Sequence, residues 1–220
     1  KTHKSERVLA VGNPGFNTQE FHVERLPEEE KEVQGIAGCY PGAVQPLVEG
    51  DATKERVKQE MELANVIHLA SHYIVDENSP MLSKLLLAPG LHSSADGKEA
   101  AGVLEAREIY GMHLASARLV VLSACQTGVE RYYRGEGMIG MSRTFLAKRV
   151  PLVVASLWPA DSEATALLMV NFHQYRAQGQ STVNALQQAQ LDMLRNSPDN
   201  HYHQPYYWAA FMLIGGDAPF

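Results

Sequence analysis

The sequence has 220 residues, of which 45% are hydrophobic, with a formal net charge of −6 and a pI near 5.8. This length and apolar content suit one globular domain over residues 1–220, because no Pro/Gly/Ser-rich linker divides the apolar segments. The acidic balance and scattered Lys and Arg argue against direct nucleic-acid binding, and no apolar run approaches the ~20 residues of a membrane span.

The first part of the chain alternates short apolar runs with amphipathic segments. Residues 7–12 predict a buried strand that a turn signal ends. A helix is predicted from 27 to 37, and we interpret the acidic residues 28–32 as its solvated first turn. Residues 43–48 predict a strand at a sheet edge, since a proline lies within it. A second helix follows, with Asp51 as its expected cap.

The same alternation continues to the end of the chain and predicts a mostly parallel sheet with helices on both faces. The remaining predicted strands lie at 66–72, 83–90, 119–125, 151–158 and 208–214, and the remaining predicted helices lie at 104–114, 138–148, 161–178 and 181–196. Asp161 and Ser181 are the expected caps of the last two helices.

Two of these strands end on side chains that can carry chemistry. His72 ends the strand at 66–72, and Cys125 ends the strand that begins at Leu119. Sites in open α/β sheets form beyond the carboxyl ends of the strands, so parallel neighbours would bring both residues to one edge. A thiol beside an imidazole is the arrangement for nucleophilic catalysis through a thiolate. We therefore predict a cysteine peptidase.

The two cysteines also allow a plainer interpretation. Free cysteine is often a small buried hydrophobic residue, but Cys125 stands at a strand-to-loop junction with Gly128 three residues later. Such a turn would expose the sulfur and place backbone N–H groups near it. Cys39 has no such context and is interpreted as a packing residue at a helix end. Two distant cysteines make no disulfide framework, which favours a reducing, cytoplasmic location.

The histidines leave a metal-dependent hydrolase open as another possibility. His68 and His72 are four residues apart on one predicted strand, so both would face the same side. Without a third close ligand this is a weak metal signal, and we interpret His68 as a satisfied interior residue and His72 as the acid–base group. Surface or capping roles are expected for His113, His173, His201 and His203.

Several ordered motifs resemble the CHAT domain, a caspase-like peptidase family often found after tetratricopeptide repeats. The resemblance covers nearly the whole chain. The motifs that carry it are Val66–His72, Asn78–Ser83 with Leu85–Leu87, Leu122–Gly128, Gly135–Gly137, Ala155–Pro159 with Ala164-Thr165, and Trp208–Phe211 with Gly215.

The resemblance implies a caspase-like three-layer α/β sandwich with about six strands. It also implies a His72/Cys125 dyad, in which the thiolate attacks a peptide carbonyl and the imidazolium protonates the leaving amine. The oxyanion would be held by the backbone N–H groups of Tyr73 and Cys125. Substrate contacts are expected from Asp161, Ser162 and Glu136. No metal and no cofactor are expected.

Two positions depart from the family pattern. Relatives commonly have glycine directly after the histidine, whereas this chain has Tyr73, for which a glycine-only backbone angle would be costly. The acidic pair often found after Trp-Pro is Asp161-Ser162 here, which weakens a strict preference for Arg or Lys before the cut.

The partners implied are a protein substrate and an upstream tetratricopeptide or other regulatory domain, with no membrane and no nucleic acid. Since the sequence begins with Lys1, we expect it to be the C-terminal part of a longer protein. The long segment from Gln126 to Gly137 suggests an activity held back until a partner or ligand orders it. The main alternative is a catalytically inactive scaffold of the same fold, with Tyr73 marking decay of the site.

Overall fold

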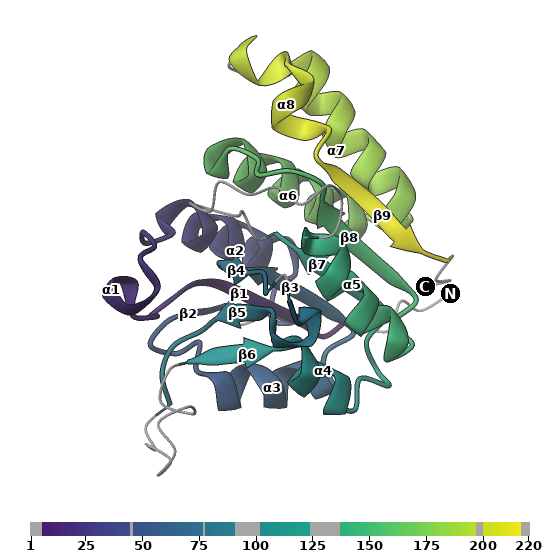
Figure 1. Ribbon diagram of the computed structural model, residues 1–220. Helices are drawn as coiled ribbons and strands as arrows, with labels where there is room; N and C mark the ends of the chain where they lie inside the picture. The colour runs from purple at the N-terminus through teal and green to yellow at the C-terminus, as the bar shows by residue number, and fades with distance from the viewer. Residues whose placement is uncertain are drawn as a thin grey trace.

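The computed structural model describes residues 6–44, 46–76, 78–90, 102–123, 137–196 and 200–216, with residues 137–140 described for their backbone alone. Its centre is a six-stranded sheet in the order β2-β1-β3-β7-β8-β9 (Figure 1). The strands are β1 (Val8–Pro14), β2 (Leu47–Glu49), β3 (Val66–Ala70), β7 (Leu119–Leu122), β8 (Leu152–Ser156) and β9 (Phe211–Gly215). All neighbours pair in parallel except β8 and β9. The predicted α/β class with a mostly parallel sheet is therefore confirmed.

Helices cover both faces of this sheet (Figure 1). On one face lie α2 (Pro27–Cys39), α6 (Ser162–Ala177) and α7 (Thr182–Asn196), and on the other lie α3 (Lys54–Leu63), α4 (Ala106–Gly111) and α5 (Gly137–Ala147). The described chain also contains short helical elements: α1 (Thr18–Phe21), η1 (Pro80–Leu82), η3 (Asn200–His203) and α8 (Pro205–Trp208).

The strands are apolar throughout because each one feeds two cores. In β3, Val66 and Ala70 pack toward the face of α2 and α6, whereas Ile67 and Leu69 pack toward the face of α3 and α5. The side chains of Ile67 and Leu69 are almost fully buried, and burial of this kind stabilises the fold by about 1.5–3 kcal/mol per side chain. This two-sided burial is the reason why the strands read as continuous apolar runs rather than as alternating ones.

A second, three-stranded antiparallel sheet follows β3 directly. It contains β4 (Tyr73–Ile74), β5 (Lys84–Leu86) and β6 (Val103–Glu105) in the order β4-β5-β6. The prediction of a helix over 104–114 was thus partly wrong, because the first residues of that segment pair with β5 and only Ala106–Gly111 are helical. Tertiary pairing decides between strand and helix in so short an apolar segment.

Three other local predictions need correction. The strand predicted at 43–48 is only Leu47–Glu49, although it does lie at a sheet edge. Thr53, rather than Asp51, caps α3 by accepting a hydrogen bond from the Arg56 N–H at 3.3 Å. The last strand begins at Phe211, since the residues before it form α8.

Gly12 allows α2 to lie close against β1. A Cβ atom at this position would be 2.3 Å from the Glu29 carbonyl oxygen and 2.8 Å from a methyl group of Val33. The first two turns of α2 are therefore fixed against the carboxyl-terminal half of β1. That is the edge of the sheet at which the candidate site lies.

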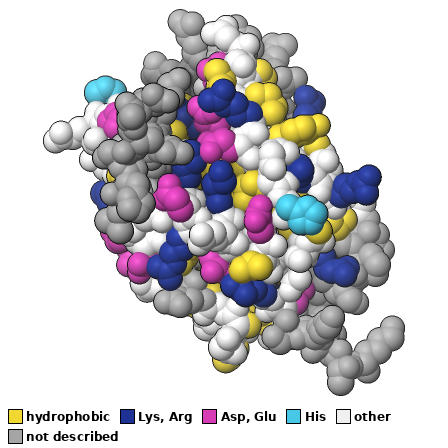
Figure 2. Space-filling view, turned by 90° about the horizontal axis from the view of Figure 1, so that it is seen from below, with side chains coloured by type: hydrophobic (Ala, Val, Ile, Leu, Met, Phe, Trp, Pro, Cys, Tyr) yellow, Lys and Arg dark blue, Asp and Glu magenta, His cyan; other side chains and the backbone are white. Residues whose placement is uncertain are grey.

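The face seen from below in Figure 2 carries positive and negative side chains interspersed with apolar ones. Such mixing is typical of a solvated surface rather than of a single-sign binding stripe. Among the helices of the described residues, none combines the length and apolar character needed to cross a bilayer.

Candidate active site

β3 and β7 are parallel neighbours in the middle of the sheet. His68 pairs with Val121, and Leu69 pairs with Leu122. The pairing continues for one residue, because the Ser123 N–H donates to the Leu69 carbonyl at 2.9 Å. Both strands thus deliver their following residues to the same edge, as the sequence predicted for this pair.

His72 follows β3 at that edge and is almost fully buried, with 2% of its surface exposed. Its Nε2 donates a hydrogen bond to the Glu24 carbonyl oxygen at 2.8 Å. The Phe16 ring packs against the imidazole in an edge arrangement, with 5.1 Å between ring centroids. These polar and aromatic contacts, both from the segment between β1 and α2, help to orient the imidazole.

These contacts determine which ring nitrogen can act as a base. A carbonyl oxygen only accepts hydrogen bonds, so Nε2 carries the proton in the neutral ring and Nδ1 is the basic nitrogen. Burial lowers the pKa of His72 from its ordinary value of 6.5, and the hydrogen bond to Glu24 opposes this shift. Because the pKa lies below 6.5, the imidazole is mainly neutral at pH 7 and can accept a proton through Nδ1.

Tyr73 begins β4 and pairs with Leu85 of β5. The Leu86 N–H donates to the His72 carbonyl at 3.0 Å, which makes Tyr73 and Leu85 a non-hydrogen-bonded pair of the ladder. The Tyr73 N–H therefore points away from β5. Tyr73 has no positive φ, so the strain expected for tyrosine in a glycine conformation is not present.

Cys125 and Glu136 lie outside the described residues. Ser123 is the last described residue of the β7 segment, two positions before the cysteine. The predicted distance between the sulfur and the His72 ring therefore stays a prediction. Cys39, by contrast, is described and ends α2, where its thiol contacts the carbonyl oxygens of Gly35 and Val170. It is a packing residue at a helix end, as predicted, and burial raises its pKa.

Asp161 and Ser162 start α6 at the same edge of the sheet. The Asp161 side chain accepts a hydrogen bond from the Ala164 N–H at 2.9 Å and so caps the helix, as expected. The Ser162 hydroxyl donates to Glu29 Oε1 on α2 at 2.8 Å. Ser162 stands where relatives often have a second acidic residue, and its hydroxyl is hydrogen-bonded to the Glu29 carboxylate instead.

The interpretation of residues 28–32 as a solvated turn was wrong for two of them. Glu29 is 3% exposed and Glu32 is 0% exposed. Burial raises the pKa of Glu29, with the hydrogen bond from Ser162 acting against this shift. The sequence did contain the signal, because Glu29, Glu32, Val33 and Ile36 follow the i, i+3, i+4, i+7 spacing of one helix face.

His68 and His173 belong to a buried polar chain behind the sheet. His68 contacts Glu32 Oε1 at 2.7 Å through Nε2 and His173 Nε2 at 3.2 Å through Nδ1. His173 in turn contacts the Tyr40 hydroxyl at 3.1 Å. His68 is thus a satisfied interior residue, as predicted. The surface role expected for His173 was wrong, since this residue is fully buried.

The metal-site possibility has little support in the described part of the chain, where no three His, Cys, Asp or Glu side chains converge into a ligand set. Both ring nitrogens of His68 are engaged by Glu32 and His173, whereas Nε2 of His72 is engaged by Glu24. In these contacts the two histidines share no partner.

Comparison with known proteins identifies a family and two relatives that resemble this chain. The family model described as the CHAT domain matches residues 1–216. Tetratricopeptide repeat protein 28 from Homo sapiens is 28% identical over 226 residues, which cover 87% of this chain and 8% of that protein. The Mus musculus protein of the same name is 27% identical, with 98% of this chain and 10% of that protein covered. The chain thus spans a tenth or less of the length of these relatives.

Among solved structures, the Arg-specific cysteine proteinase gingipain R aligns with a TM-score of 0.54 and 6% sequence identity. The alignment covers 96% of this chain and 46% of that chain. At this identity the likeness concerns the fold alone, which is the caspase-like α/β sandwich that the resemblance implied.

Proposed function

The chain belongs to the CHAT domain family, and from this premise we propose that it is a cysteine endopeptidase domain with a His72/Cys125 dyad. The observation that carries the proposal is the environment of His72. Its Nε2 is occupied by the Glu24 carbonyl, its pKa is lowered by burial, and it lies at the end of a strand parallel to the one that leads to Cys125. A buried imidazole with one nitrogen held by a carbonyl is well suited to general base catalysis.

The proposed reaction begins with transfer of the Cys125 thiol proton to Nδ1 of His72. The thiolate attacks the scissile carbonyl carbon, and the carbonyl π electrons move to its oxygen. When this tetrahedral intermediate collapses, the C–N bond breaks and the imidazolium donates its proton to the leaving amine. Water, deprotonated by Nδ1, then attacks the thioester, and the proton returns to the sulfur as the carboxylic acid leaves.

The oxyanion would be held by the backbone N–H groups of Tyr73 and Cys125. The orientation of the Tyr73 N–H away from β5 supports this assignment, because the ladder does not consume the donor. The Tyr73 N–H is fixed in a strand and so needs no reorganisation during the reaction, and loss of one oxyanion donor commonly costs about 10²–10³ in kcat.

We propose that Asp161, Ser162 and Glu136 contact the substrate. The support is the position of Asp161 and Ser162 at the carboxyl-terminal edge of the sheet, together with the link from Ser162 to the buried Glu29. Carboxylates at this edge would favour a basic residue before the cleaved bond. The solved structure that aligns with this fold is described as Arg-specific, which makes Arg and Lys the first residues to test.

We further propose that flanking tetratricopeptide repeats regulate this peptidase activity and that the protein acts in the cytoplasm. The names of both relatives support the association with repeats. Limited proteolysis of residues 126–137, with and without the native flanking domains, tests it. Protection only in the longer protein is expected, whereas equal protection in both would contradict it.

The competing function is a scaffold without catalysis, which the burial of His72 favours, since only 2% of its surface is exposed. Incubation with a diverse peptide library, followed by mass spectrometry, separates the two functions. If the chain is a peptidase, the parent should yield cleaved peptides that are absent with Cys125→Ala. A library left intact by the parent chain and by the chain with its flanking domains would favour the scaffold.

A further inference from the structure

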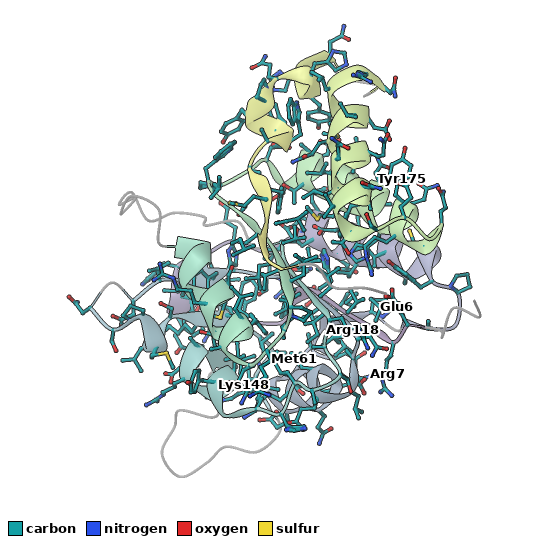
Figure 3. The ribbon with its side chains drawn as sticks, turned by 90° about the vertical axis from the view of Figure 1, so that its right-hand side faces the viewer. Glu6, Arg7, Met61, Arg118, Lys148 and Tyr175 are labelled. Carbon is teal, nitrogen blue, oxygen red and sulfur yellow. The ribbon has the colours of Figure 1, made fainter. Side chains whose placement is uncertain are left out.

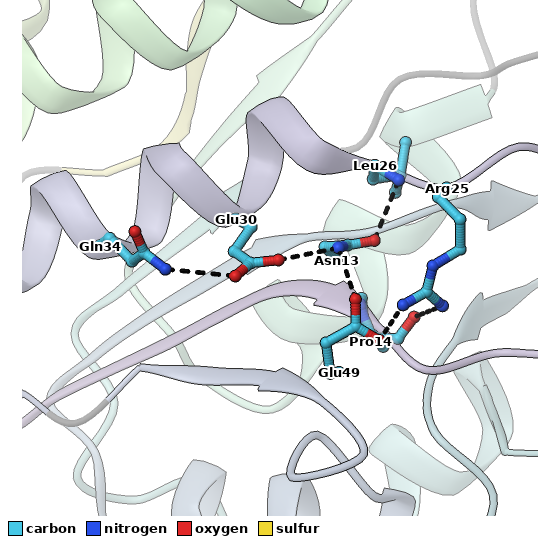
Figure 4. A network of polar contacts seen from close by, with 7 residues as sticks. All are labelled: Asn13, Pro14, Arg25, Leu26, Glu30, Gln34 and Glu49. Atoms are coloured by element: carbon cyan, nitrogen blue, oxygen red, sulfur yellow. Dashed lines mark hydrogen bonds and ion pairs between the residues drawn. The ribbon is translucent and has the colours of Figure 1, made fainter.

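The segment that holds His72 is itself fixed by a polar network in the described part of the chain (Figure 4). Glu24, whose carbonyl accepts the His72 hydrogen bond, belongs to no helix or strand. The two residues that follow it make the contacts. Arg25 donates to the Pro14 carbonyl at 3.0 Å and pairs with Glu49, and the Leu26 N–H donates to Asn13 Oδ1 at 3.0 Å.

Asn13 and Glu49 connect these contacts into one unit (Figure 4). The Asn13 amide donates to Glu49 Oε1 and to Glu30 Oε2, each at 3.0 Å. Asn13 is 4% exposed and has a φ of +42°, and Glu49 has a φ of +47°. The carboxyl-terminal ends of β1 and β2 and the first turn of α2 therefore meet at this network, and the Glu24–Leu26 segment is attached to it.

Arg25 also acts on the second contact of His72. Its guanidinium lies 5.4 Å from the centroid of the Phe16 ring, and the same ring packs edge-on against the His72 imidazole. The Glu24 and Phe16 contacts of the imidazole are therefore both connected to the Arg25 side chain. The first passes through the backbone of Glu24, and the second passes through Phe16.

We propose that Arg25 is a positioning residue for His72, which acts through the Glu24 carbonyl and the Phe16 ring to keep Nδ1 as the basic nitrogen. The consequence for catalysis rests on the function proposed above, whereas the positioning itself does not. Within the described residues, Arg25 contacts Pro14, Glu49 and Phe16, so its role is to position His72 rather than to react.

The exposure of the Arg25–Glu49 pair indicates that Arg25 positions its neighbours rather than stabilises the fold. The side chains of Arg25 and Glu49 are 38% and 51% exposed, and ion pairs at such sites add little to stability. Loss of the pair should therefore leave the fold intact and still release the Glu24 carbonyl. This combination of effects is what a merely structural surface ion pair would not produce.

The experiment uses nuclear magnetic resonance of [¹⁵N]histidine-labelled protein, with the His72 signals assigned from a His72→Gln variant. In the parent chain the Nε2–H tautomer should dominate. In Arg25→Met the ring should become a mixture of both tautomers and titrate at lower pH, because the Glu24 hydrogen bond that opposes the effect of burial on its pKa is lost. Arg25→Lys, which keeps the charge toward Glu49, should lie between the two.

A matched control is Arg7→Met. Arg7 pairs with Glu60 at 2.7 Å, has a side chain that is 51% exposed, and precedes β1 at the end of the sheet opposite His72 (Figure 3). This variant removes a comparable ion pair and should leave the His72 signals unchanged. If it shifted them as much as Arg25→Met does, the effect would be general and the proposal would be overturned.

Glu49→Gln provides a second variant should Arg25→Met fold poorly, because it weakens the ion pair of Arg25 and alters neither Glu24 nor Phe16. The same direction of change is expected. Unchanged tautomer and titration in the folded variants would overturn the proposal. Where substrate is turned over, kcat should fall about fivefold with little change in KM, since a net hydrogen-bond contribution of ~1 kcal/mol corresponds to about that factor.

Discussion

The His72 imidazole donates its Nε2 proton to the carbonyl oxygen of Glu24 at 2.8 Å, across 48 residues of sequence. This contact fixes the tautomer, and the burial that accompanies it lowers the pKa of the ring. The strand that carries His72 to the edge of the sheet is parallel to the one that leads to Cys125. The proposed chemistry depends on these relationships, and each can be tested separately.

The pH dependence of peptide hydrolysis should reflect the burial of His72. A general base acts only when it is neutral, so kcat/KM should rise with pH as the ring loses its proton. Because burial lowers this pKa, the acid limb should lie below 6.5, the ordinary value for the group. Measurement of kcat/KM from pH 4.5 to 8 checks this. An acid limb at or above 6.5 would contradict the assignment of His72 as a buried base.

His173 should make the whole fold sensitive to acid. Burial lowers its pKa well below 6.5, so the unfolded chain binds a proton that the folded chain rejects. Stability is therefore complete above about pH 6.5 and falls as the pH drops from there toward the folded pKa. One such group contributes up to about 1.4 kcal/mol per pH unit.

The test is urea unfolding of the parent and of His173→Gln between pH 7 and 5. The variant should lose less stability over this range, although it starts lower because contacts with His68 and Tyr40 are altered. The raised pKa of Glu29 acts in the opposite direction at lower pH, so only the difference between the two chains is informative. If the free energy of unfolding changed equally with pH in both chains, His173 would bind its proton in the folded chain as readily as in the unfolded one.

Two glycines near α2 should respond in opposite ways to alanine. Gly12→Ala places a methyl group against the Glu29 carbonyl and Val33, so α2 must shift, at a cost of about 1–3 kcal/mol. Gly38→Ala meets no atom within 4 Å and lies in the same helix, so it should stabilise by about 0.5–1 kcal/mol. Urea midpoints measure both. If Gly12→Ala left the urea midpoint unchanged, the close packing of α2 on β1 would not be required for stability.

Asp161 has a capping role that can be separated from its proposed role toward substrate. Asp161→Asn keeps a side-chain acceptor for the Ala164 N–H and removes only the charge, whereas Asp161→Ala removes the cap and should cost about 1 kcal/mol. If Asp161 also attracts a basic substrate, Asp161→Asn should lower kcat/KM for Arg and Lys peptides with no change in stability. Unchanged kcat/KM would leave Asp161 with the cap alone.

The apolar strands could be predicted from sequence, and so could the position of His72 just after the end of β3. Runs such as Val66–Ala70 are buried on both faces, and this leaves a direct pattern in the chain. The caps at Asp161 and Ser181 were also predictable, because capping is local, and the Ser181 hydroxyl does accept from the Asn184 N–H.

The partners of the buried polar residues could not be predicted in this way. His173 becomes an interior residue through contacts with His68 and Tyr40, which lie 105 and 133 residues away. The segment around Arg25 has no apolar period at all, so its hold on His72 depends wholly on tertiary contacts. The inward position of Glu29 and Glu32 was visible in their spacing, yet their charge favoured a solvated interpretation.

The most direct test of the central claim is mass spectrometry of the chain after reaction with a peptidyl chloromethyl ketone. The parent should be modified once, at Cys125. Cys39 serves as an internal control, because its thiol has a raised pKa and contacts two carbonyl oxygens. His72→Ala should slow modification at least about tenfold, as expected on loss of a general base. Equal reaction at both cysteines, or an unchanged rate in His72→Ala, would contradict a His72/Cys125 dyad.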